Sequence, residues 1–344
     1  MNGENNVSKN ISLDFIKGLP KAELHLHLEG TLEPDLKLKL AQKNKVDIGQ
    51  ETIEEIKASY QFDSLPSFLN IYYPAMNVLQ EEEDFYELAM AYLRNAKEQG
   101  IKHAELFFDP QAHTTRGVSF ETVVNGYHRA ISESEELGIT SELIMCFLRD
   151  MSAESAEKTL EEALPYKDKF IGVGLDSDEK GNPPSKFAHV FEKARAAGLK
   201  LTMHCDIDQE NSIEHIRQVI EDIKVDRIDH GTNIVEDQKL VDYVKEHGIG
   251  LTSCPVSNGF VVDDMKGKEI IELLDQGVKV TVNSDDPAYF QSYISDDLFA
   301  LATKYDMSQE QVVQLAKNSF EVSWITEEEK NRYLEMIDTY VKNY

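Results

Sequence analysis

The sequence contains no run of roughly eighteen consecutive apolar residues, the length that a membrane-spanning helix requires. The N-terminal segment MNGENNVSKN is polar and includes no apolar stretch of the kind found in a secretion signal. Cysteine is scarce. The three residues Cys146, Cys205 and Cys254 lie far apart, and an odd, scattered set is typical of free thiols in a reducing compartment. These absences predict a cytoplasmic protein without a membrane-spanning segment.

Positive charge is also in short supply. The chain has 35 lysines and arginines against 63 aspartates and glutamates, which gives a formal net charge of −28. Nucleic acids and anionic membranes are bound through clustered basic residues, so neither is an expected partner. A small neutral substrate fits this charge better than an anionic nucleotide does.

No low-complexity tract, short repeat or linker rich in proline, glycine and serine interrupts the sequence. Hydrophobic residues make up 41% of the chain, which allows a sizeable core and excludes a disordered protein. We expect a single domain over residues 1–344, because α/β barrels often exceed the usual length of about 150 residues per domain. Helical apolar spacing from about residue 33 to 99 predicts several helices inserted early in this domain.

Short apolar runs that end in polar residues recur along the chain. The runs are Ala22–Leu28, Ala104–Phe108, Leu143–Leu148, Phe170–Leu175, Leu199–Met203, Arg227–Asp229, Ile249–Cys254 and Val278–Asn283. Most are continuously apolar, which is typical of parallel strands that are buried on both faces. Between them lie the helical patterns Phe120–Leu137, Ala153–Leu164, Pro184–Ala197, Ser212–Ile223, Gln238–His247 and Met265–Gln276.

This alternation predicts an α/β fold, a (β/α)8 TIM barrel with extra helices inserted after the first strand. Several of the helical patterns end in glycine just before the next strand, as a helix C-terminus often does. A doubly wound open sheet is the alternative. That fold is disfavoured because no G-x-G-x-x-G sequence follows an early strand.

Ionisable residues gather where the predicted strands end, which in a barrel is the rim that carries the active site. His25 and His27 are two residues apart on the first strand, so both imidazoles face the same side. Together with His204 and Asp285 at the ends of later strands, they offer three nitrogens and one oxygen to a metal ion. Such a set suits Zn²⁺ with a position left for water.

His230 ends another predicted strand, where a neutral imidazole can orient a metal-bound water or take its proton. The alternative is that each histidine only satisfies a buried hydrogen bond. That interpretation does not explain why the set falls at the ends of strands.

Four sequence motifs together resemble the adenosine/adenine deaminase branch of the amidohydrolase superfamily, closest to the adenine deaminase type. They are LPKAELHLHLEGTL (Leu19–Leu32), the strand-five histidine His204, DRIDHG (Asp226–Gly231) and VNSDDPAYF (Val282–Phe290). The resemblance covers about residues 15 to 340. It implies a (β/α)8 barrel, one zinc ion per chain and hydrolytic removal of the 6-amino group of a purine.

The resemblance also implies roles for individual residues. The metal would be held by His25, His27, His204 and Asp285. His230 would orient and deprotonate the attacking water. Asp286 would hydrogen-bond the water or the purine N7.

Within this branch, three features resemble enzymes that act on free adenine. Adenosine deaminases usually read HLDG after the two histidines, with an aspartate that contacts the ribose, whereas HLEG here places the longer Glu29. The segments Phe107–Gly117 and Gly174–Phe187 also resemble adenine deaminases, with Ser177 where the adenosine enzymes have glycine. We expect Glu29, Asp109 and Ser177 to contact the substrate and to exclude a ribose. The expected reaction converts adenine to hypoxanthine and ammonia.

One position departs from the family pattern. The family has HAGE at strand five, and its glutamate protonates the purine N1, but this chain has MHCDIDQENS with Ile207 in that place. Protonation of N1 needs another donor. Asp208 is favoured because a bulge after the strand could bring it in, and Asp206 is second. Both could instead be solvated loop acids.

This departure keeps other functions open. An adenosine deaminase or a deaminase of an N6-substituted adenine is one alternative. A relative that binds metal and purine without catalysis is another, although such a protein would not need to keep His230 and the whole metal set.

Overall fold

The structure is a computed structural model that describes residues 11–205 and 207–344. The polar segment 1–10 and Asp206, the second choice for the proton donor, lie outside the described residues. Within the described part of the chain, no helix is both long enough and apolar enough to cross a membrane.

Eight parallel strands form the centre of the fold, in the order of the sequence. The strands are β1 (Lys21–Glu23), β2 (Ile101–Phe108), β3 (Thr140–Leu148), β4 (Gly172–Asp176), β5 (Lys200–Cys205), β6 (Arg227–His230), β7 (Gly250–Ser253) and β8 (Val280–Val282). Each pairs with the next, and a parallel bridge between Leu26 and Asp285 joins the chain after β1 to the chain after β8. The predicted barrel is therefore confirmed.

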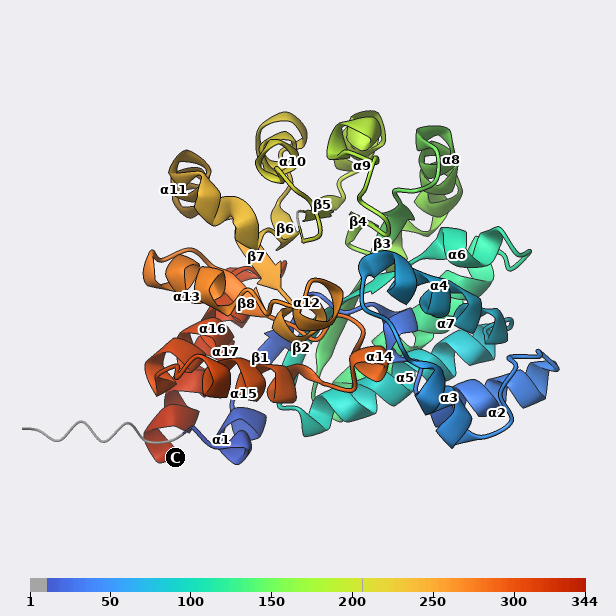
Figure 1. The fold of residues 1–344 in the computed structure, drawn as a ribbon, viewed down its shortest axis with the longest axis horizontal. Coiled ribbons are helices and arrows are strands. Elements are labelled where there is room, and N and C mark those ends of the chain that lie inside the picture. The colour runs from blue at the N-terminus through green and yellow to red at the C-terminus, as the bar shows by residue number, and fades with distance from the viewer. Residues whose placement is uncertain (1–10, 206) are drawn as a thin grey trace, which may run out of the picture.

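Helices surround these strands (Figure 1). Those that follow β2 to β8 are α6 (Pro110–Thr114), α7 (Phe120–Glu133), α8 (Ala153–Ala163), α9 (Ala188–Ala196), α10 (Ile213–Arg217), α11 (Gln238–Glu246), α12 (Pro255–Val261), α13 (Gly267–Asp275), α14 (Pro287–Phe290), α15 (Ile294–Lys304), α16 (Gln309–Glu321) and α17 (Glu327–Asn343). A short helix, α1 (Leu13–Gly18), precedes β1.

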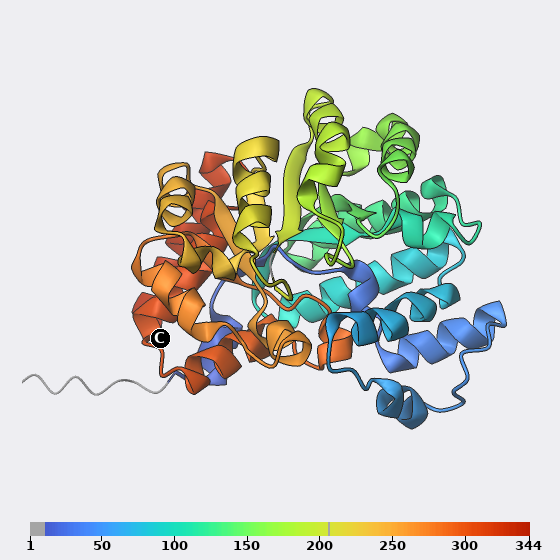
Figure 2. The same ribbon diagram turned by 45° about the horizontal axis from the view of Figure 1, so that its top comes forward.

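The helices inserted after the first strand are also present. They are α2 (Pro34–Asn44), α3 (Ile53–Ser59), α4 (Leu65–Ala75) and α5 (Glu82–Glu98), and all lie between β1 and β2. In Figures 1 and 2 this blue-to-cyan group gathers on one side of the barrel. Ser64 caps α4 through a reciprocal capping box with Ser67, which fixes where that helix starts.

The first strand is shorter than predicted, since it ends at Glu23 rather than at Leu28. The Leu24 N–H donates to the side-chain oxygen of Asn283 and not to a neighbouring strand, so the regular ladder stops there. Beyond this point the chain keeps only single bridges, at Leu26 and at His27. Both predicted strand-one histidines therefore lie in irregular backbone just past the strand.

The segment after α16 closes the end of the barrel where the strands begin. A Cβ on Gly172, the first residue of β4, would lie 2.7 Å from the Trp324 ring, and a Cβ on Gly250, the first residue of β7, would lie 2.7 Å from Val322. Glycine at both strand starts therefore allows this segment to pack closely.

A buried ion pair lies beside the segment that follows α16. Arg227 Nη1 is 2.6 Å from Glu105 Oε2, both side chains are fully buried, and the guanidinium lies 4.1 Å from the centre of the Trp324 ring. Burial alone would raise the pKa of Glu105, but Arg227 and His103 lower it to about 2. The carboxylate therefore stays ionised and holds Arg227 in the barrel interior.

We predict that Glu105→Gln lowers the free energy of unfolding by about 3–5 kcal/mol, because it leaves Arg227 buried without its counter-charge. Urea unfolding would measure this loss. Since folding lowers the pKa of Glu105 from 4.5 to about 2, the pair's contribution should be complete above pH 4.5 and fade as the pH falls towards 2. The control is Glu327→Gln, which removes an exposed pair with Lys330 and should cost less than about 1 kcal/mol. Equal losses in the two variants would contradict the assignment.

Candidate metal centre and active site

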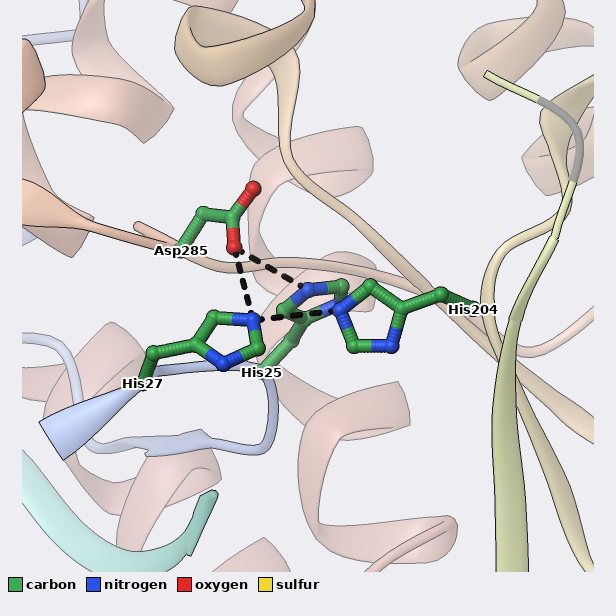
Figure 3. Close-up of side chains that lie close together, drawn as sticks. All are labelled: His25, His27, His204 and Asp285. Carbon is green, nitrogen blue, oxygen red and sulfur yellow. Dashed lines mark hydrogen bonds and ion pairs between the residues drawn. The ribbon is translucent and has the colours of Figure 1, made fainter. Parts of the chain in front are cut away.

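Four side chains converge at the carboxyl end of the barrel. His25 and His27 follow β1, His204 lies on β5, and Asp285 follows β8; their nearest nitrogen and oxygen atoms all lie within 4.8 Å of one another. Asp285 Oδ1 is 3.2 Å from the Nε2 atoms of both His25 and His27, and His27 Nε2 is 3.1 Å from His204 Nε2 (Figure 3). The predicted metal-ligand set is thus brought together around one point.

Backbone hydrogen bonds between the chain after β1 and the chain after β8 bring three of these side chains together. We call this junction the seam. Asp285 N–H donates to the carbonyl of His25 at 3.0 Å, and His27 N–H donates to the carbonyl of Asp285 at 3.0 Å. Asp285 has a φ of 62°, in the left-handed region that non-glycine residues rarely adopt. Ser257 Oγ donates to the second carboxylate oxygen of Asp285 at 2.7 Å. The backbone and this hydroxyl together direct Oδ1 towards the histidines.

Each of the three histidines also has a partner on its Nδ1 side. His25 Nδ1 lies 3.1 Å from the Thr252 carbonyl. His27 Nδ1 lies 3.3 Å from Asp176 Oδ2, and His204 Nδ1 lies 3.4 Å from Asp229 Oδ2. Such partners fix the ring orientation and tautomer of metal-bound histidines.

The four side chains have the ligand atoms and the burial that a site for a divalent metal ion requires. Three Nε2 atoms and one carboxylate oxygen are turned to the same point, and all four residues have little or no solvent exposure. Burial and the neighbouring His25 lower the pKa of His204, which keeps that imidazole neutral and able to ligate. A nitrogen-rich set of this composition suits zinc.

His230 ends β6 beside this cluster. Its ring centre lies 4.6 Å from that of His25, and its φ of 62° again departs from ordinary strand backbone. Burial and the neighbouring His25 hold the pKa of His230 well below its usual value. His230 is therefore a neutral imidazole that can accept a proton.

Asp286 lies next to Asp285 and also faces the site. Burial and the charge of Asp285 raise its pKa well above the usual value, so this carboxyl group is protonated and can donate a hydrogen bond. A Cβ on Gly30 would collide with the Asp286 carboxyl group. The glycine of HLEG therefore makes the room that Asp286 occupies.

These groups open onto a cavity at the carboxyl end of the barrel. Its walls come from the metal-ligand set, the strand ends and helix α4. Besides the ligands they include Leu65, Phe68, Leu69, Tyr72, Tyr73, Asp109, Arg149, Asp176, Ser177, Glu179, Ile207, Asp208, His230, Ser257, Val261, Asp286 and Phe290.

Besides Asp286, three other acids and polar residues expected to act on a substrate line this cavity. They are Asp109, Ser177 and Asp208. Asp109 has a pKa raised well above its usual value by burial and by Asp176, while His27 and Asp109 lower the pKa of Asp176 against the effect of its burial. The two carboxyl groups therefore share one proton.

The structure does not place Glu29 among the residues that line the cavity. Its carboxylate is fully buried, with Oε1 3.1 Å from the N–H of Asp109 and 2.7 Å from His113 Nε2. Glu29 thus supports the backbone that carries Asp109, so any influence on a substrate would pass through that residue.

Sequence reasoning missed Arg149, Glu179 and the α4 side chains. Arg149 and Glu179 do follow the ends of β3 and β4, so the strand-end rule could have identified them. The α4 residues recur at helical spacing, which predicts only an amphipathic helix.

A parallel barrel with three imidazoles and one carboxylate at its carboxyl rim defines a metal-dependent hydrolase of the amidohydrolase type. The model of the adenosine deaminase family matches residues 20–340. The chain belongs to this family, as the sequence motifs indicated.

Individual relatives are similar over nearly the whole chain. A deaminase of uncharacterised function from Schizosaccharomyces pombe is 52% identical over 96% of this chain and 98% of that protein. An adenine deaminase from Acinetobacter baylyi is 52% identical over 94% of this chain and 98% of that protein. The crystal structure of an adenine deaminase from Arthrobacter aurescens superposes with a TM-score of 0.90 at 41% identity, covering 94% of this chain and 99% of that one.

Proposed function

We propose that this chain is a zinc-dependent aminohydrolase that converts adenine and water to hypoxanthine and ammonia. The observation that carries the proposal is the three-histidine, one-aspartate cluster facing a cavity that His230, Asp109 and Asp286 also line. The adenine deaminases that are 52% and 48% identical to this chain support adenine as the substrate.

One zinc ion per chain would be held by His25, His27, His204 and Asp285. When bound, a zinc ion lowers the pKa of a coordinated water towards neutrality. Thr252, Asp176 and Asp229 keep the three imidazoles oriented for this task.

His230 accepts the first proton of the attacking water, because its imidazole is neutral and lies beside the cluster. The same proton can then pass to the 6-amino group, which leaves as ammonia. Asp286 carries a proton and donates a hydrogen bond to the purine N7, which is an acceptor. His230 thus handles the proton at the reacting C6, while Asp286 orients the purine ring through N7.

Asp208 supplies a proton to the purine N1, which gains electron density as C6 is attacked. Its side chain lines the cavity and is half-buried, and burial is the main cause that raises its pKa. A carboxyl group in such a place can act as an acid. The adjacent Ile207 lines the same wall but has no proton to give.

The Asp109–Asp176 pair supports a free base over a nucleoside. A carboxyl pair with one proton offers a donor and an acceptor together. The N3–N9 edge of free adenine presents an acceptor and an N–H, whereas in adenosine the N9 position carries the ribose. The buried Asp109–Asp176 pair would accept a hydrogen bond from the N9–H of adenine. Adenosine lacks this N–H and would leave the pair without a partner, so adenosine is disfavoured.

A deaminase of N6-substituted adenines is a second candidate. The observation that favours it is that four apolar side chains line the cavity, namely Leu65, Leu69, Ile207 and Val261. An alkyl group on the exocyclic nitrogen would fit such a wall. It would leave as an alkylamine instead of ammonia.

The experiment that tests the function is a purine panel on zinc-loaded protein, with adenine, adenosine and N6-methyladenine. Release of ammonia and of methylamine is measured separately. We expect adenine to give the highest kcat/KM. A preference for N6-methyladenine would favour the second candidate. No turnover with any purine would favour a non-catalytic binding protein.

Two histidine variants separate metal binding from catalysis. We predict that wild-type protein binds about one zinc ion per chain and that His204→Ala loses both the ion and activity. His230→Ala should keep the ion but lose kcat by about a hundredfold or more, as expected for a general base. Metal analysis and steady-state kinetics measure both. Stoichiometric zinc in His204→Ala, or near-native turnover in His230→Ala, would contradict these roles.

The two acids after β5 are tested in the same way. We predict that Asp208→Ala lowers kcat by at least about a hundredfold with zinc retained, and that Asp206→Ala has the smaller effect. If only Asp206→Ala is damaging, the proton donor is Asp206. If both variants are nearly as active as the wild type, the proton comes from elsewhere.

A further inference from the structure

A second group of metal-binding side chains lies against the first. His27, Asp109 and Asp176 each offer one ligand atom, and the three atoms lie within 4.8 Å of one another. His27 Nδ1 is 3.3 Å from Asp176 Oδ2, whereas Nε2 of the same ring is 3.2 Å from Asp285 Oδ1. His27 therefore belongs to both groups and presents one ring nitrogen to each.

The strand ends bring these three residues together. His27 forms a parallel bridge with Phe107, two residues before Asp109. Asp176 is the last residue of β4. All three side chains line the cavity, so an ion that enters the active site can reach them.

The group is deeply buried and short of hydrogen-bond donors. The exposed fractions are 1% for Asp109, 3% for Asp176 and 6% for His27. Apart from a proton shared by the two carboxyl groups, no donor among the described residues reaches either carboxylate oxygen of Asp109 or the Oδ1 atom of Asp176. Buried carboxylate oxygens are costly unless donors or a cation satisfy them. A metal ion held between the three side chains would satisfy these oxygens.

The charge of the cavity also favours a cation. Among the described residues, six aspartate and glutamate side chains line it, whereas Arg149 is the one lysine or arginine that does so. A ligand set of one imidazole and two carboxylates suits zinc, which binds both nitrogen and oxygen. Mg²⁺ prefers oxygen ligands and keeps several waters, so it suits the set less well.

We propose that His27 Nδ1, Asp109 and Asp176 form a second, inhibitory zinc site that fills after the first site and competes with the substrate. His27 would then join the two ions through its ring, and the protons displaced from the three side chains would pass to solvent. In the proposed function, Asp109 and Asp176 bind the N3–N9 edge of adenine, so zinc and adenine need the same atoms. The inhibition therefore rests on the proposed function, but binding of the second ion does not.

The binding is tested by equilibrium dialysis at increasing free zinc, followed by metal analysis. We expect the second ion to bind at least about tenfold more weakly than the first, since it has three protein ligands in place of four. At the same free zinc, Asp109→Asn should keep the first ion and carry one ion fewer than the wild type. The matched control is Asp208→Asn, which removes another carboxylate from the same cavity and should carry as many ions as the wild type. Equal zinc content in Asp109→Asn and the wild type, or a lost ion in the control, would overturn the assignment.

Cobalt separates this site from sites elsewhere on the acidic surface. Two Co²⁺ ions joined by one imidazole ring are magnetically coupled, so the EPR signal of protein that carries both ions should be smaller than the sum of two isolated ions. Asp109→Asn should show no coupling. An uncoupled signal from wild-type protein with two bound ions would place the second ion elsewhere and overturn the proposal.

The inhibition is tested with adenine and protein that carries one zinc ion. At free zinc ten times the dissociation constant of the second site, competitive binding should raise KM about elevenfold and leave kcat unchanged. Mg²⁺ at the same concentration should change neither constant. A fall in kcat at constant KM, or equal inhibition by Mg²⁺, would contradict competition at this site.

The cobalt measurement needs no turnover, so it keeps the two proposals distinguishable. A coupled second ion in a protein that deaminates no purine would uphold the site but overturn the proposed function, and with it the inhibition. An active adenine deaminase that shows no coupled second ion would overturn the second site alone.

Discussion

The register between the first and last strands is the constraint on which the site depends. Two reciprocal backbone hydrogen bonds join Asp285 to His25 and His27, and the parallel bridge at Leu26 lies between them. A shift of one residue along this seam would turn the ligands to opposite faces. Closing the barrel and assembling three of the four ligands are therefore the same event, and β5 adds His204 from across the rim.

The reactivity of the site depends on which of the buried acids and histidines at the carboxyl end of the barrel are ionised. Burial places many acids and histidines in one cavity, where they cannot all be ionised at once. Burial alone would raise the pKa of Asp229, but the hydrogen bond from His204 together with the nearby His204, His25 and Arg227 lowers it, so Asp229 stays ionised. Burial and neighbouring carboxylates instead raise the pKa of Asp109 and of Asp286. The outcome is one neutral base, His230, among carboxyl groups that donate hydrogen bonds. A neutral purine, which offers ring-nitrogen acceptors, is complementary to such a cavity.

The sequence allowed the fold and the metal cluster to be predicted because both leave local signals. Continuous apolar runs mark buried strands, and the H-x-H spacing at His25 and His27 marks one face. The direction of Glu29 could not be predicted, since a carboxylate in a tight turn can face either the cavity or the interior behind it. The strand-end rule could have pointed to Glu179, but its ion pairs with Arg149 and His215 needed the three-dimensional structure, because these partners come from distant parts of the chain.

The most direct test of this account is X-ray absorption at the zinc edge of the loaded protein. We predict scattering from three imidazole nitrogens and from oxygen at about 2.0–2.1 Å, with no sulfur. The described residues also bring His25 and His230 within reach of Cys254, which is a competing set of ligands. A sulfur shell at about 2.3 Å would show that the ion binds there and would contradict the account.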